Sequence, residues 1–120
     1  ELVLVEDMPN TLALAHYKSA DIIFDQCLIG FHGYFALEGM ALGKPVMSFI
    51  RYPNEYLLLP NECPIVKTSL DTLKRDIVTL CKNRQLLNEL GRKGRVYIEN
   101  NFTIEAVSLR MSNAYRELGV

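Results

Sequence analysis

The sequence predicts an α/β fold, with a Rossmann-like parallel sheet flanked by helices and a helical C-terminal tail. Short apolar runs that are typical of buried strands alternate with helix-like segments through the first half of the chain, which is the pattern of parallel β-α-β units. The last third contains only helix-like segments. The 120 residues suffice for one small domain with one core, so we treat 1–120 as a single domain.

The first half supplies three strand candidates and two helix candidates. Leu2–Val5 is a continuous apolar run and predicts a buried strand. Asn10 or Thr11 is suited to cap a helix that runs to about Ser19. The remaining expected elements are a strand within Ala20–Asp25, a glycine-containing loop, a helix over Tyr34–Leu42 that Gly43 ends, and a strand over Val46–Ile50.

The second half is mainly helical. Three prolines within 51–64 forbid a long element there. Gly91 and Gly94 lower helix propensity, and we expect a kink or break near them. We expect the last helices to wrap the sheet or to reach toward a partner domain. The expected elements are a strand over Cys63–Lys67, a helix capped by Ser69 or Asp71 that ends near Lys82, a helix over 83–100, and a last helix opened by Thr103.

Composition restricts the classes of partner. The net charge of −1 gives no general attraction to nucleic acid, and no apolar run reaches the ~20 residues that span a membrane. Cys27, Cys63 and Cys81 lack the spacing of a metal site, and an odd number of cysteines without a leader sequence favours a reducing compartment. We therefore expect no metal and no cofactor.

The strongest functional pattern is the segment Gly30–Glu38. In open α/β sheets, ligands bind in the loops that lead from the carboxyl ends of strands into helices, and this segment is such a loop. Gly33 lets the backbone approach a ligand closely. The N–H groups of Tyr34 and Phe35 begin the next helix, where they lack partners within the helix. Together with the helix dipole, these donors suit a diphosphate.

Several polar residues are candidates with an alternative structural role. Glu38 lies one turn into the helix and leans toward its start, where it would accept hydrogen bonds from sugar hydroxyls, unless it forms a salt bridge or faces solvent. Asp25 at a strand end and His32 as a general base are the catalytic candidates, with a loop-packing role as the alternative for His32. We expect Arg51 either to approach the ligand or to form a surface ion pair. The residues Tyr52, Glu55 and Tyr56 line the pocket or cover the core.

These segments resemble a known family. Ala20–Ile23, Gly30–Glu38 and Met40–Val46, in this order, are similar to the C-terminal, nucleotide-sugar-binding domain of retaining glycosyltransferases with the GT-B fold (family 4 type). The resemblance covers essentially the whole chain, because Leu86–Gly91 and Asn101–Glu105 look like its closing helices. It implies that 1–120 is a fragment of a longer, two-domain hexosyltransferase of polysaccharide biosynthesis, and that this lobe alone is inactive.

The resemblance also implies a role for each matching residue. Glu38 would bind the ribose, and the amides of Gly33, Tyr34 and Phe35 would hold the diphosphate and the sugar of a UDP-sugar or GDP-sugar. The loop containing Val5, Glu6 and Met8 would lie near the base, and Gly30, Phe31 and His32 complete the expected substrate-binding set. The acceptor, a glycan or lipid-linked sugar, would be held by the missing N-terminal domain. The expected location is the cytoplasm or the inner face of the membrane.

Three positions depart from the family pattern, and Gly30 is the main one. The family has a glutamate where this chain has Gly30, and a proline-serine pair where it has Asp25 and Gln26. Either of these two polar residues is a candidate to take over the lost contact with the sugar. A divergent subgroup of the family explains the departure, and the alternatives are a sugar-nucleotide epimerase-like lobe and a non-catalytic nucleotide-binding module. The Arg/Lys pair that neutralises the leaving diphosphate in the family lies upstream of this chain.

Overall fold

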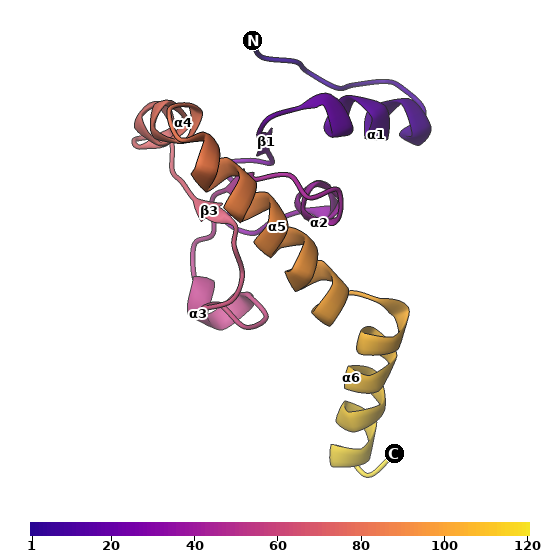
Figure 1. Cartoon of the computed structure of the whole chain (residues 1–120). Helices are drawn as coiled ribbons and strands as arrows, with labels where there is room; N and C mark the ends of the chain where they lie inside the picture. Colours follow the sequence, from indigo (N-terminus) through magenta and orange to yellow (C-terminus); the bar gives the residue numbers. More distant parts are fainter.

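The sheet has three parallel strands in the computed structural model, which describes all 120 residues (Figure 1). The strands are β1 (Ile23–Phe24), β2 (Val46–Ser48) and β3 (Val66–Lys67), in the order β1-β2-β3. Ile23 pairs with Val46, and Met47 pairs with Val66. The predicted α/β class, with a parallel sheet flanked by helices, is confirmed, although the sheet is small.

The chain has six helices, and five of them lie where the sequence predicts a helix. The proline-containing segment, expected to be irregular, holds one additional short helix, α3. The bounds are α1 (Asn10–Ser19), α2 (Tyr34–Ala41), α3 (Pro53–Tyr56), α4 (Leu73–Cys81), α5 (Arg84–Asn101) and α6 (Ile104–Glu117).

Leu2–Val5 does not form the predicted strand. Its backbone makes no hydrogen bond within the chain, and Leu2 and Leu4 are 90% and 74% exposed. In Figure 1 this N-terminal segment runs outside the sheet, beyond α1. A strand needs a neighbour that pairs with its N–H and C=O groups, and no strand lies beside this segment. The prediction of a buried strand at Leu2–Val5 is therefore wrong.

Helix α5 is continuous, so the expected kink at Gly91 and Gly94 is wrong. A Cβ atom at Gly91 would lie 2.1 Å from the carbonyl oxygen of Gly43, and one at Gly94 would lie 3.1 Å from the Met40 side chain. These glycines therefore let α5 cross the end of α2 in close contact. Gly43 itself has a φ of 72° and follows the C-terminus of α2, the role that the sequence predicts for it.

Two of the predicted helix caps differ from the structure. The residue before α1 is Pro9, and neither Asn10 nor Thr11 caps this helix with its side chain. Helix α4 follows Thr72, whose side chain accepts a hydrogen bond from the backbone N–H of Ser69, so the expected cap by Ser69 or Asp71 is wrong. By contrast, Thr103 opens α6 as predicted and accepts from the backbone N–H of Ala106.

Both faces of the sheet are covered, and α5 contributes to each. Successive strand residues point to opposite faces, so Val46 and Met47 of β2 belong to different apolar clusters. Val46 packs with Met40 of α2 and Tyr97 of α5. Met47 packs with Leu80 of α4 and Leu87 of α5. The loops at the carboxyl ends of β1 and β2 are thus attached to a rigid, two-sided core.

Helix α6 projects away from the sheet (Figure 1). None of its residues is buried, and Ile104, Leu109 and Met111 are among its exposed apolar side chains. Of the two closing helices, α5 therefore packs across the sheet while α6 extends beyond it. No helix combines the length and the apolar character that crossing a membrane requires.

Candidate functional site

The loop between β1 and α2 is held in shape by the side chain of Gln26. Its Nε2 donates to the backbone oxygens of Phe31 (2.8 Å) and Phe49 (2.9 Å). Its Oε1 accepts from the backbone N–H groups of Leu28 (2.7 Å) and Ile29 (2.8 Å). All of these bonds join the loop to itself or to the end of β2. Because its amide is engaged in this way, Gln26 has a structural role in shaping the loop.

Asp25 positions the residue that precedes α2. Its Oδ2 accepts from the backbone N–H of Gly33 (3.0 Å) and from the hydroxyl of Ser48 (3.1 Å), and Ser48 is fully buried. Its other oxygen, Oδ1, makes no hydrogen bond. The carboxylate lies beside the start of a helix, where the dipole favours negative charge. Asp25 thus fixes Gly33 and keeps one oxygen free for a further contact.

The backbone conformation at position 30 favours glycine. It is buried with a φ of 91°, in the left-handed region that favours glycine. A Cβ atom there would lie 3.1 Å from Cβ and 3.2 Å from Nε of Arg51, and the Gly30 carbonyl accepts from the Arg51 N–H (2.9 Å). A glutamate would therefore be strained at this position. Arg51 covers Gly30 without forming an ion pair, so the predicted surface ion pair is absent.

The start of α2 is open. Gly33 precedes the helix, and no side chain caps it. The backbone N–H groups of Tyr34 and Phe35 donate to no acceptor in the chain, and Tyr34 is 85% exposed. Unpaired donors at a helix start, together with the helix dipole, form a favourable place for an anion.

Glu38 is half-buried and has no hydrogen-bond or ion-pair partner in the chain. The alternative that it forms a salt bridge is therefore not observed. Burial, and secondly the negative charge of Glu38, raise the pKa of Tyr17 above its ordinary value. The Tyr17 ring also packs against Phe35 with centroids 4.7 Å apart. Tyr17 of α1 thus lies beside both the first turn of α2 and the Glu38 carboxylate.

Tyr17 also lines a cavity of about 220 Å³ beside α1. All three residues expected near a nucleotide base, Val5, Glu6 and Met8, line the same cavity. Sequence reasoning does not select Tyr17 for the site, because an apolar residue within a helix more often packs into the core. Tyr17 lines the cavity together with the segment before α1, and its ring packs on Phe35 at the start of α2. The charge of Glu38 also acts on it. The cavity is completed by Asp7, Asn10 and Ala13.

His32 is held within the loop. Its ring stacks on Phe31 with centroids 4.3 Å apart, and its Nδ1 lies 3.4 Å from the carbonyl oxygen of Gly33. It has no hydrogen bond to Asp25, so the two catalytic candidates do not form an acid–base pair. This arrangement matches the loop-packing alternative for His32.

Sequence reasoning missed Ser48, whose hydroxyl donates to Asp25. The available signal was that Ser48 is the single polar residue in the apolar run Val46–Ile50.

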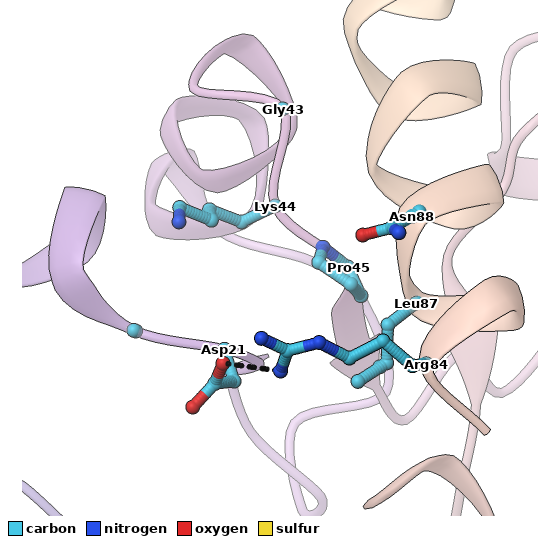
Figure 2. A pocket seen from close by; sticks show the side chains of 8 residues that line it. Asp21, Gly43, Lys44, Pro45, Arg84, Leu87 and Asn88 are labelled. Carbon is cyan, nitrogen blue, oxygen red and sulfur yellow. Dashed lines mark hydrogen bonds and ion pairs between the residues drawn. The ribbon is translucent and has the colours of Figure 1, made fainter.

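A larger cavity of about 310 Å³ lies at the opposite end of the strands (Figure 2). Pro45 directly precedes β2, which places this cavity at the amino ends of the strands. Arg84 and Asp21 form an exposed ion pair across it, with 3.5 Å between Nη1 and Oδ1. Lys44 lines this cavity, at the far end of α2 from its open start. We place the candidate site at the carboxyl ends of the strands, because the open start of α2 and the Asp25 carboxylate lie there. The smaller cavity, beside α1, is assigned to the same site.

Comparison with protein-family models, with curated proteins and with solved structures gives no match to this chain. No group of three or more His, Cys, Asp or Glu side chains is arranged to hold a metal ion. The functional argument therefore rests on the residues of the loops after β1 and β2, on α2, and on the cavity beside α1.

Proposed function

We propose that this chain binds the nucleoside diphosphate sugar donor of a glycosyltransferase. One observation supports this proposal most strongly: α2 carries both an open start and, one turn later, the unpaired Glu38 carboxylate, and its Phe35 packs against Tyr17, which lines the cavity. Each feature suits a different part of such a donor. We further propose that glycosyl transfer requires a second lobe, which would hold the acceptor in the main, as the family resemblance implies.

The diphosphate would bind at the start of α2. The free N–H groups of Tyr34 and Phe35 would donate to its oxygens, and the helix dipole would stabilise its charge. Gly33 has no side chain to obstruct the approach, and its own N–H is already bound by Asp25. The Arg51 guanidinium, unpaired beside Gly30, adds a positive charge on the other side of the same loop.

The nucleoside would extend from the diphosphate toward α1. Glu38 would accept hydrogen bonds from the ribose hydroxyls, which gives its half-buried and unpaired carboxylate the partners that it lacks within the chain. The base would enter the cavity lined by Val5, Glu6 and Met8, with Tyr17 as an aromatic wall. The donor sugar would lie near the loop Gly30–Gly33, where the free Oδ1 of Asp25 would accept from a sugar hydroxyl.

Isothermal titration calorimetry of the chain against UDP, GDP and ADP tests this proposal. We expect at least one nucleotide to bind in the millimolar to micromolar range. Glu38→Ala should weaken that binding by about 1–3 kcal/mol, because hydrogen bonds to the hydroxyls are lost. Glu117→Ala, which removes an exposed glutamate from the end of α6, is the matched control and should leave binding unchanged. Equal affinities of wild type and Glu38→Ala would refute the ribose role.

A non-catalytic nucleotide-binding module is the second candidate function. It is favoured by the loop itself, because Gly30 has no side chain and the Gln26 amide is engaged in loop hydrogen bonds. Only Asp25 retains a free carboxylate oxygen there. Product analysis with the full-length protein separates the functions: transfer to an acceptor indicates a glycosyltransferase, an altered sugar indicates an epimerase, and binding without turnover indicates a module.

A further inference from the structure

Three exposed aromatic side chains meet where the loops after β1 and β2 come together. The Phe31 and Tyr56 rings have centroids 6.2 Å apart at 85°, and the Tyr52 and Tyr56 rings have centroids 5.8 Å apart at 69°. Their exposed fractions are 40% for Phe31, 50% for Tyr52 and 54% for Tyr56. We call these three residues the aromatic cluster. None of the donor contacts proposed above uses Tyr52 or Tyr56.

Packing does not account for the exposure of the cluster. Aromatic side chains stabilise a fold through the large apolar area that they bury, and Tyr97 shows this behaviour with 4% exposure. In the aromatic cluster, edge-to-face contacts fix the rings against one another while leaving about half of each side chain in water. The hydroxyls of Tyr52 and Tyr56 make no hydrogen bond within the chain. His32 stacks on one face of Phe31, so the exposed parts of the three rings and the two tyrosine hydroxyls are free to contact a ligand.

We propose that the aromatic cluster binds a pyranose ring of the carbohydrate acceptor. This inference rests on the proposed donor function, because it places the acceptor beside the end of the loop that would hold the donor sugar. The C–H face of a pyranose carries partial positive charge and packs on the negative faces of aromatic rings. The two tyrosine hydroxyls and the unpaired Arg51 guanidinium supply partners for the hydroxyl groups of the sugar.

The geometry favours a sugar over a nucleotide base. A planar base stacks best on a flat aromatic face, whereas the rings of the aromatic cluster are tilted by 85° and 69° and form an angled surface. A puckered, hydroxyl-bearing ring fits such a surface. The cavity assigned to the base is built from other residues, those before α1 and within it. The two ends of the proposed site thus have separate residues, which can be varied independently.

An NMR titration of the ¹⁵N-labelled chain with three methyl glycosides tests the inference. The probes are methyl β-D-glucopyranoside, methyl β-D-galactopyranoside and methyl α-D-mannopyranoside. We expect at least one to cause saturable shifts of the backbone amides of Phe31 and of Tyr52–Tyr56. Tyr56→Ala should weaken this binding by about fivefold or more, since loss of one stacked ring is worth about 1–3 kcal/mol. Tyr115→Ala removes a tyrosine of similar exposure (52%) from α6 and should change nothing.

Parallel titrations with UDP, GDP and ADP separate this inference from the proposed function. Nucleotide binding without any glycoside binding would overturn the inference and leave the donor proposal standing. Glycoside binding without nucleotide binding would overturn the donor proposal and leave the aromatic cluster as a sugar-binding surface. If Tyr56→Ala weakens nucleotide binding instead, the cluster stacks on the base and the inference is wrong. Tyr52→Ala provides a second test if Tyr56→Ala does not fold, as judged by its circular dichroism spectrum, and unchanged glycoside affinity would overturn the inference.

Discussion

Substitution of Gly91 by alanine tests how closely α5 packs on the end of α2. The added Cβ would lie 2.1 Å from the Gly43 carbonyl oxygen and 3.0 Å from its carbon, and both are backbone atoms that cannot rotate away. A real contact needs roughly 1 Å more, so α5 must shift. Overpacking typically costs about 1–3 kcal/mol, and a 2.1 Å contact with backbone places this substitution at the upper end, about 3 kcal/mol, whereas alanine gains about 1 kcal/mol in helix propensity. We expect a net loss of about 2 kcal/mol.

Gly94→Ala is the matched comparison. Its Cβ would lie 3.1 Å from Cγ, 3.2 Å from Cβ and 3.4 Å from Cα of Met40, so the two helices need to separate by only a few tenths of an ångström. The gain in helix propensity should then offset most of the strain, giving a change near zero. Urea denaturation measures both variants, with the midpoint and slope compared to wild type. Gly91→Ala as stable as wild type, or no more costly than Gly94→Ala, would refute the close-packing argument.

Three further predictions follow from named contacts. Asp25→Ala leaves the buried Ser48 hydroxyl and the Gly33 N–H without their acceptor, so urea denaturation should show a loss of about 1–3 kcal/mol and Asp25→Asn should lose less. Hydrogen bonds from Thr72 and Thr68, and secondarily Arg75, lower the pKa of Asp76 below 3.8, so its stabilising contribution is present above pH 3.8 and is lost as pH falls through the lowered value. Asp76→Asn should therefore flatten the acid side of a melting-temperature profile, and an unchanged profile would contradict this. Glu38→Gln keeps the shape of the side chain but removes its charge, so the pKa of Tyr17, followed by ultraviolet titration, should fall toward its ordinary value.

The positions of the helices and the carboxyl-end loop could be predicted because local patterns determine them. Gly33 before α2 and Gly43 after it bracket an apolar segment, and both bounds lie within one residue of the expected ones. Leu2–Val5 shows the limit of this reasoning. Its apolar run predicts an extended conformation, but pairing into a sheet depends on a neighbouring strand, which the run itself does not specify.

Long-range contacts explain the remaining differences. Gly91 suggested a weak helix because glycine lowers propensity, whereas the close approach of Gly43 gives its physical reason. Asp25 and Gln26 suggested sugar contacts, but the residues that they bind, Ser48 and Phe49, follow more than 20 positions later. The position of Tyr17 beside Glu38 likewise depends on how α1 lies against α2. No local pattern contains these pairings.

The central claim is that the free amides of Tyr34 and Phe35 hold the diphosphate of a nucleotide. The most direct test follows these two amide resonances during titration of the ¹⁵N-labelled chain with UDP, GDP and ADP. We predict that both shift downfield and saturate with at least one nucleotide, while inorganic sulfate at the same ionic strength gives smaller shifts. Saturable shifts confined to residues around Lys44 and Arg84, with Tyr34 and Phe35 unmoved, would contradict the claim.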